Sequence, residues 1–212
     1  MKALIIGATG ATGKDLVKVL VKDPDYTELV IFVRRPIGIA SPRIKEVLTN
    51  FDRLEEVSAF INGDVWFSCL GTTLKTAGSK KKQWHIDYEI PLKFAAFAKT
   101  AGIPSAVLVS AYGAKPTSNV FYSQMKGKLE ESLEALKFDQ FIIFRPGMLL
   151  RPDTDRPAER FIAGALKFLN TLGLIKKFKP LPTSVLAEKL SKAPKVLPAG
   201  KHIISLDKIA AF

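Results

Sequence analysis

Short apolar runs and helical patterns alternate along most of the chain. A continuous apolar run such as 29–33, rich in β-branched and aromatic residues, is typical of a strand buried on both faces of a sheet. Between such runs, apolar residues recur three or four positions apart, which predicts amphipathic helices. The predicted strands are 2–6, 29–33, 43–48, 64–70, 106–109, 140–144 and 202–205, and the predicted helices are 15–21, 54–61, 87–100, 119–136, 158–172 and 183–190.

A glycine-rich turn joins the first predicted strand to the first helix. In such turns one glycine permits the sharp bend, a second lets the backbone approach a pyrophosphate, and a third lets helix and strand pack closely. The unpaired N–H groups of the helix N-terminus then face the anion. Directly after the first strand of an alternating chain, the turn predicts a dinucleotide site. Its residues are Gly7, Ala8, Thr9, Gly10, Ala11, Thr12 and Gly13.

Two arginines, Arg34 and Arg35, follow the second predicted strand at once. In NAD sites the end of this strand usually carries Asp or Glu for the ribose 2′-hydroxyl, whereas arginine suits a 2′-phosphate. A solvent-facing basic turn is the alternative interpretation, and without the glycine-rich turn it would be preferred. With that turn one helix and one strand earlier, the arginines favour NADP(H) over NAD(H).

The alternation of strand and helix predicts an α/β fold, a Rossmann-type doubly wound parallel sheet with helices on both faces. Residues 1–150 are predicted to form the NAD(P)-binding domain. The pattern weakens over 151–212, which we expect to form a short C-terminal cap on the carboxyl edge of the sheet, on the substrate side of the same compact unit. Pro91 is expected in the first turn of the helix 87–100, where proline is tolerated.

Composition places the chain among ordinary globular proteins. It has 212 residues, of which 47% are hydrophobic and 25% charged. No apolar run approaches the ~18 residues of a membrane span, and the N-terminus has no signal-peptide pattern. The one cysteine, Cys69, gives no disulfide framework and fits a reducing cytoplasm, which we predict as the location. The two histidines are too few and too far apart in sequence for a metal site.

The formal net charge of +12 is less usual. It could mark a nucleic-acid or membrane-surface partner, or a solvated surface together with a site for an anionic cofactor. The densest clusters, Lys80–Lys82 and Lys176–Lys177, are expected in loops without a recognition helix or aromatic stacking motif. The favoured interpretation is therefore a solvated surface together with a site for an anionic cofactor.

The exit of the strand 64–70 offers further cofactor contacts. Gly71 would let a ligand lie against the backbone, and the hydroxyls of Thr72 and Thr73 could reach a ribose. Cys69 is interpreted as a core residue, because no activating base for a nucleophilic cysteine is evident nearby.

Tyr122 and Lys126 are the candidate catalytic pair. They are four residues apart on one predicted helix and therefore share a face. A nearby ammonium favours the phenolate form of a tyrosine, so Lys126 could assist proton transfer by Tyr122 and also anchor the nicotinamide ribose. Ser110, at the end of the strand 106–109, could hydrogen-bond the substrate oxygen. A core tyrosine with a satisfied hydroxyl is the alternative.

These motifs occur in the order found in the atypical short-chain dehydrogenase/reductases, which the sequence resembles over about residues 2–156. Within that family it most resembles the Tat-interacting, NADPH-binding oxidoreductase group. The segments that carry the resemblance are GATGATG, Arg34-Arg35, Cys69-Leu70-Gly71-Thr72-Thr73, Ser110, Tyr122-x-x-x-Lys126 and Phe144-Arg145-Pro146-Gly147.

The resemblance implies a role for individual residues. Arg34 and Arg35 would hold the 2′-phosphate, and Tyr122 and Lys126 would be catalytic. Many members of the family carry consecutive serines at the position where Ser110 precedes Ala111 here. The tail of this chain is also shorter than the substrate domain of the extended short-chain enzymes, so the sugar-nucleotide substrates of those enzymes are not implied for this chain. Implied pyrophosphate contacts are Thr9, Gly10, Ala11 and Thr12, and other implied cofactor contacts are Leu70, Gly71, Leu149 and Arg156.

Three functions remain open from the sequence. The leading hypothesis is an NADP-dependent oxidoreductase that acts on a small carbonyl or alcohol. The alternative is an NADPH-sensing regulatory protein with little or no catalysis, which the short tail favours. A third, nucleic-acid binding through the lysine clusters, rests on charge alone. The sequence leaves open the substrate, the reaction direction, and a homodimer or protein partner.

Overall fold

A single parallel sheet organises the structure, a computed structural model that describes residues 1–38, 41–150 and 180–212. Its seven strands lie in the order β3-β2-β1-β4-β5-β6-β9, and every neighbouring pair is parallel. This confirms the predicted Rossmann-type fold. The strands are β1 Lys2–Ile6, β2 Glu28–Val33, β3 Ile44–Leu48, β4 Val65–Ser68, β5 Ser105–Val109, β6 Gln140–Arg145 and β9 Gly200–Ser205, with a separate parallel pair β7 Leu149–Leu150 and β8 Leu181–Pro182.

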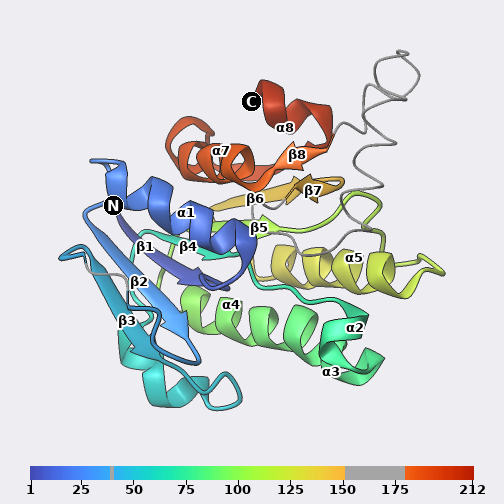
Figure 1. Cartoon of the computed structure of the whole chain (residues 1–212), viewed down its shortest axis with the longest axis horizontal. Helices are drawn as coiled ribbons and strands as arrows, with labels where there is room; N and C mark the ends of the chain where they lie inside the picture. The colour runs from blue at the N-terminus through green and yellow to red at the C-terminus, as the bar shows by residue number, and fades with distance from the viewer. Residues whose placement is uncertain (39–40, 151–179) are drawn as a thin grey trace.

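Helices cover both faces of the sheet (Figure 1). On one face lie α1, α7 and α8, and on the other lie α4 and α5. Each face has its own apolar core, which explains why the central strands read as continuous hydrophobic runs. The described helices are α1 Ala11–Lys22, η1 Leu54–Phe60, α2 Leu74–Ala77, α3 Lys80–Trp84, η2 His85–Glu89, α4 Ile90–Thr100, α5 Phe121–Glu134, α7 Thr183–Val196 and α8 Asp207–Ala211.

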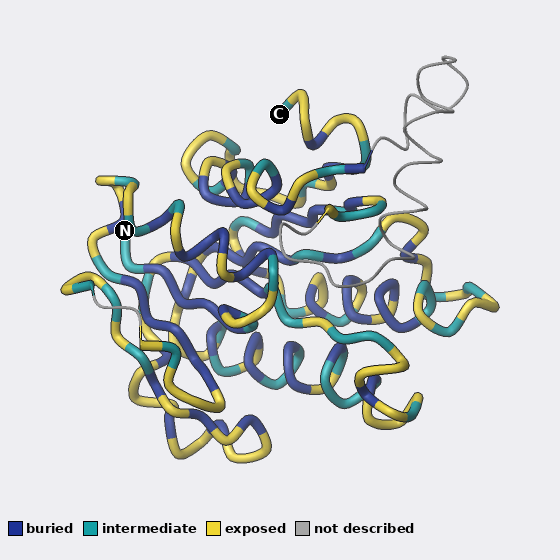
Figure 2. Tube along the Cα trace, viewed as in Figure 1, coloured by how far each residue is buried: buried dark blue, intermediate teal, exposed yellow. Residues whose placement is uncertain are grey.

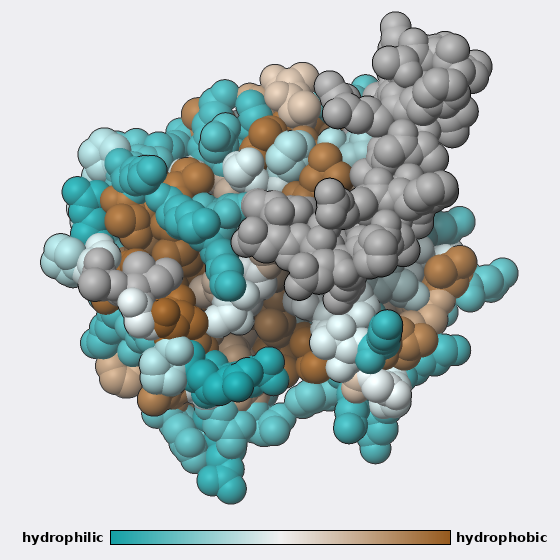
Figure 3. Space-filling model, viewed as in Figure 1, coloured by the Kyte–Doolittle hydropathy of each residue, from teal (hydrophilic) through white to brown (hydrophobic). Residues whose placement is uncertain are grey.

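Burial is deepest along the middle strands (Figure 2). On one face Trp66 of β4 stacks on Phe94 of α4, with ring centroids 5.6 Å apart. On the other face Leu16 of α1 and Leu186 of α7 are fully buried in the same core. Hydrophilic residues cover much of the outer surface in the view of Figure 3, as the binary pattern of the helices requires.

The helix predicted over 87–100 is longer than expected. Helical backbone continues from Lys80 to Thr100 and includes a π-helical turn, η2, at its centre. Pro91 therefore lies inside the helical run, where the turn before it changes the hydrogen-bond spacing: the Ile90 N–H donates to the His85 carbonyl, five residues back. The cluster Lys80–Lys82 lies in α3, so its prediction as a loop is wrong. The Ser79 side chain caps this helix by accepting from the Lys82 N–H.

The C-terminal region completes the sheet where a cap was expected. Strand β9 pairs with β6 from Gln140↔Gly200 to Arg145↔Ser205, and α7 packs against α1 on one face. The predicted boundary at residue 150 would therefore divide the sheet, because β9 lies beyond this residue and pairs with β6. Apolar residues such as Leu186 and Leu190 require burial, and α1 provides it. The predicted helix 158–172 and the cluster Lys176–Lys177 lie outside the described residues.

Candidate active site

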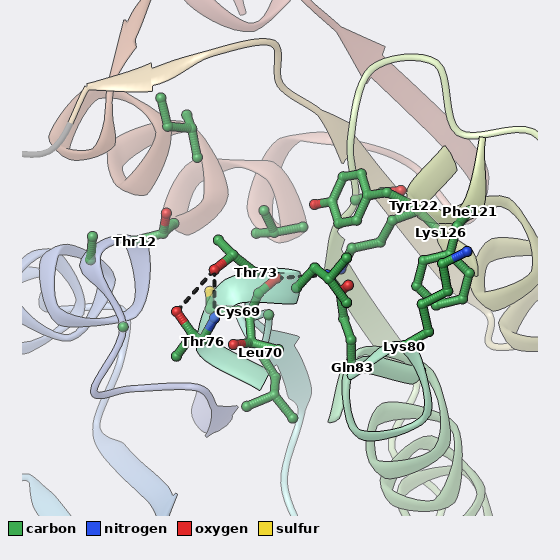
Figure 4. Close-up of a pocket in the computed structure, with 18 of the residues that line it drawn as sticks. Thr12, Cys69, Leu70, Thr73, Thr76, Lys80, Gln83, Phe121, Tyr122 and Lys126 are labelled. Atoms are coloured by element: carbon green, nitrogen blue, oxygen red, sulfur yellow. Dashed lines mark hydrogen bonds between the residues drawn. The ribbon is translucent and has the colours of Figure 1, made fainter. Parts of the chain in front are cut away.

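A pocket of about 690 Å³ opens among the carboxyl ends of the central strands (Figure 4). Parallel sheets of this kind bind ligands at that edge, and the volume suits a cofactor with a small substrate. No acidic residue is among the described residues that line it. The lining residues are Gly10, Ala11, Thr12, Cys69, Leu70, Gly71, Thr72, Thr73, Leu74, Thr76, Lys80, Gln83, Val109, Ser110, Val120, Phe121, Tyr122, Lys126 and Leu149.

The glycine-rich turn forms one side of this pocket. Gly7 has a φ of +80°, and a Cβ on Gly13 would lie 2.1 Å from the Gly7 carbonyl oxygen, so both positions require glycine. Gly10 is the N-cap of α1, and no side chain caps the helix. The first N–H groups of α1 therefore point to a pocket wall made of Gly10, Ala11 and Thr12. This arrangement fits a pyrophosphate.

Arg34 and Arg35 are exposed and lie outside the pocket lining. They follow β2, which runs parallel to β1 in the register Ile6↔Phe32. The two arginines and the glycine-rich turn therefore follow neighbouring strands at the same edge of the sheet. Thr9 is also exposed and does not line the pocket.

The loop after β4 forms the floor of the pocket. The Gln83 side chain donates to the Thr72 carbonyl oxygen at 3.1 Å, which ties α3 to this loop. The Thr73 hydroxyl accepts from the Thr76 N–H at 3.1 Å and fixes the start of α2. Cys69 lines the pocket, but burial raises the pKa of its thiol to about 12, so it is held as an unreactive thiol.

Helix α5 directs Tyr122 and Lys126 into the same pocket. The Lys126 ammonium lies 6.0 Å from the centroid of the Tyr122 ring. Lys126 is 2% exposed, whereas Tyr122 is 40% exposed. The helix therefore holds a buried ammonium beside an accessible phenol, as the spacing of the two residues predicts.

A buried carboxylate, Asp87, stands behind Lys126. Its side chain is fully buried in the π-helical turn, and one oxygen accepts from the Thr72 N–H at 2.7 Å. The other oxygen has no hydrogen-bond partner in the described chain and lies 4.0 Å from the Lys126 ammonium. Burial raises the pKa of Asp87 to about 6, against the lowering effects of Lys126 and the Thr72 N–H. Asp87 thus links the β4 loop to the helix that carries Tyr122.

The raised pKa gives a prediction for Asp87→Asn. Between about pH 4 and pH 6 the folded protein keeps a proton on Asp87 that the unfolded chain releases, so the stability of the wild type falls as pH rises through this window. The variant lacks this titration. Its free energy of unfolding relative to the wild type should therefore rise by about 2–3 kcal/mol from pH 4 to pH 6 and stay level above. Denaturant titrations of both proteins at pH 4, 5, 6 and 7 measure the difference, and a pH-independent difference would contradict the raised pKa.

Ser110 does not have the free hydroxyl that the sequence suggested. It lines the pocket, but its hydroxyl donates to the buried carboxylate of Glu130. Glu130 also accepts from the guanidinium of Arg145, whose Nε lies 3.0 and 3.2 Å from the two carboxylate oxygens and whose pKa this contact raises. A hydroxyl has one hydrogen to donate, so Ser110 in this arrangement can accept from a ligand but cannot donate to a substrate oxygen.

Most of the candidate site residues meet in one pocket. Gly7 and Gly13 support the turn from behind, and Arg156 lies outside the described residues. Sequence reasoning missed Asp87, Glu130 and Lys80. The i, i+4 spacing of Glu130 after Lys126 was an available signal, whereas nothing local marks Asp87 as the carboxylate behind Lys126. The candidates that line the pocket are Gly10, Ala11, Thr12, Leu70, Gly71, Thr72, Ser110, Tyr122, Lys126 and Leu149.

Solved structures resemble the fold over almost the whole chain. The structure titled "MoeE5 in complex with UDP-glucuronic acid and NAD" matches with a TM-score of 0.75 and 16% identity, and covers 97% of this chain and 76% of that one. A short-chain dehydrogenase/reductase superfamily protein from Agrobacterium tumefaciens with bound NAD matches with a TM-score of 0.73 and 14% identity, over 97% of this chain and 77% of the other. At such identity the likeness concerns the fold alone.

No described helix is long and apolar enough to cross a membrane. Proteins similar in sequence to this chain include two that are named as mitochondrial, FMP52 of Eremothecium gossypii and FMP52 of Saccharomyces cerevisiae. The cytoplasmic location of this chain therefore stays a prediction. In the described ranges, no group of three or more His, Cys, Asp or Glu side chains could hold a metal ion.

Named relatives share about a third of the sequence. Protein HTATIP2 of Rattus norvegicus is 36% identical over 173 residues, 79% of this chain and 70% of its own. The mitochondrial protein FMP52 of Saccharomyces cerevisiae is 32% identical over 186 residues, 85% of this chain and 80% of its own. The sequence profile described as NAD(P)H-binding matches residues 7–167. The chain therefore belongs to the NAD(P)H-binding family and, within it, to the atypical short-chain dehydrogenase/reductase group that its motifs resemble.

Proposed function

We propose that this protein is an NADP(H)-dependent oxidoreductase that reduces a small carbonyl compound or oxidises the corresponding alcohol. One observation carries the proposal: Tyr122 and Lys126 line the same pocket as the uncapped N-terminus of α1. A dinucleotide whose pyrophosphate binds at α1 would extend along the pocket toward Tyr122. When bound, the nicotinamide supplies the hydride donor or acceptor.

The residues of this chain would bind the cofactor at several points. The N–H groups of Ala11 and Thr12 would hydrogen-bond the pyrophosphate at the positive end of α1. Arg34 and Arg35, whose guanidinium groups suit bidentate phosphate binding, would hold the 2′-phosphate. The exposed backbone of Gly71 would let the cofactor lie against the β4 loop.

Tyr122 would move the proton at the substrate oxygen. Its phenol is accessible, and the buried ammonium of Lys126 lies 6.0 Å from the centroid of its ring. Asp87 would orient Lys126 from behind and balance part of its charge. Because the Ser110 hydroxyl donates to Glu130, the proposal assigns proton transfer to Tyr122 alone.

Calorimetry with NADPH and NADH tests the proposal. The purified protein should take up NADPH and bind it more tightly than NADH, since NADH lacks the phosphate that the arginines would bind. A panel of aldehydes and ketones, followed by NADPH absorbance, then tests turnover. No uptake of NADPH, or clearly tighter binding of NADH, would overturn the proposal.

A further inference from the structure

The pocket has an unassigned positive end beyond the proposed catalytic pair. In Figure 4, Lys80 and Phe121 lie on the opposite side of the pocket from Thr12, and Tyr122 and Lys126 lie between them. With a pyrophosphate bound beside Thr12, the end at Lys80 would be left for the substrate.

Lys80 has donors available for a ligand. It is exposed, lines the pocket, and forms no ion pair with any described residue. Its ammonium lies 5.5 Å from the centroid of the Phe121 ring, a cation–π contact that uses none of its three N–H donors. A second cation, Lys128, lies 5.7 Å from the neighbouring Trp84 ring, which itself is 6.3 Å from Phe121. Because no described acidic side chain lines the pocket, this end attracts anions.

The position of Lys80 is fixed by its helix. Ser79 caps α3, and Gln83 is 3% exposed and bonds to the Thr72 carbonyl of the pocket floor. Lys81 and Lys82 belong to the same exposed cluster but do not line the pocket. One lysine of the three is therefore directed to the ligand.

Exposed apolar side chains line the same pocket as this ammonium. Val120 is 62% exposed and Leu74 is 46% exposed, and both line the pocket, as does Phe121. Exposed apolar groups in a pocket gain stability when an apolar part of a ligand covers them. The pocket thus combines a cation that can donate hydrogen bonds to an anion with exposed apolar side chains.

We infer that the substrate is a carbonyl compound with an apolar body and a carboxylate, and that Lys80 binds the carboxylate while Leu74, Val120 and Phe121 contact the body. The inference rests on the proposed function, because it assumes that the cofactor occupies the end near Thr12. Lys80 is a specificity residue in this arrangement, and Tyr122 acts at the other end of the same molecule.

Benzoate and benzamide, which differ in charge but little in shape, test the inference on the NADP⁺-loaded protein. The two tryptophans provide the readout by NMR: the indole N–H of Trp84 should shift, whereas that of the fully buried Trp66 serves as internal reference. Benzoate should bind roughly tenfold more tightly than benzamide, since Lys80 is solvent-exposed and its ion pair is partly screened. Lys80→Met should remove this preference, and the matched variant Lys82→Met should keep it.

Several outcomes would overturn the inference. Equal affinity for the two probes, no binding of either, or a benzoate preference that survives in Lys80→Met would each contradict it. So would a tenfold loss of NADP⁺ affinity in Lys80→Met, because Lys80 would then belong to the cofactor site. Nucleotide binding is measured first in the same samples: failure to bind NADP⁺ contradicts the proposed function, whereas normal binding without a benzoate preference contradicts only the inference.

Discussion

Tyr122→Phe is expected to lower kcat for carbonyl reduction by roughly 10²–10⁴-fold, the usual contribution of a positioned proton donor. The substitution removes the hydroxyl and keeps the ring beside Lys126. NADPH affinity should be unchanged, because the proposed cofactor contacts lie on other residues. Steady-state kinetics on a substrate from the carbonyl panel, with calorimetry of NADPH binding, measure both quantities.

Tyr112→Phe is the matched control for this variant. Tyr112 is 50% exposed and does not line the pocket, so its replacement should leave kcat at the wild-type level. Wild-type turnover in Tyr122→Phe would show that the phenol is not the proton donor. If the wild type binds NADPH but turns over no carbonyl compound of a broad panel, the regulatory alternative gains support instead.

Removal of both arginines after β2 should abolish the preference for NADPH. In the double variant Arg34→Ala/Arg35→Ala, NADPH affinity is expected to fall by roughly 100-fold, since each charge-assisted contact to a phosphate contributes about 1.5–3 kcal/mol and exposed contacts lie near the lower limit. NADH has no 2′-phosphate, so its affinity should not change. Calorimetry of both nucleotides at two salt concentrations measures the effect, and the wild-type preference should weaken at the higher salt.

Arg53→Ala supplies the control for charge alone. Arg53 is exposed and pairs with Glu56 at 3.3 Å, away from the pocket lining. Its removal changes the net charge without removing a guanidinium from the end of β2, and both affinities should stay at their wild-type values. An equal loss of NADPH and NADH affinity in the double variant would indicate that the arginines hold the turn in place and do not read the phosphate.

The fold could be predicted because its signals are local. Runs such as 29–33 are apolar on every position, which only a strand buried on both faces requires, and the structure has β2 there. The glycine-rich turn could be predicted for the same reason. Gly13 has no room for a Cβ, so the structure of the turn requires glycine at this position of the sequence. The role of residues 180–212 could not be read in this way: β9 has exposed positions along its length, a pattern that suits an edge strand of the sheet as well as a separate element.

The candidate site was predictable where one helix carries it. Tyr122 and Lys126 meet because a fixed spacing on α5 brings them to one face. Asp87 escaped prediction because the π-helical turn changes which residues of that helix face Lys126 and the β4 loop, and no periodic pattern predicts such a turn. The hydrogen bond from Ser110 to Glu130 joins residues 20 positions apart on different elements, which only the packed structure reveals.

The packing of α7 on α1 has a consequence for how the protein is made. Thr183 donates to Asp15 at 2.6 Å, and the Tyr26 hydroxyl donates to the carbonyl oxygen of Ser191, 165 residues later, at 2.7 Å. The segment that follows the glycine-rich turn is therefore synthesised more than 160 residues before its partners in α7. Until α7 is synthesised, the part of α1 that α7 covers stays accessible to chaperones and proteases.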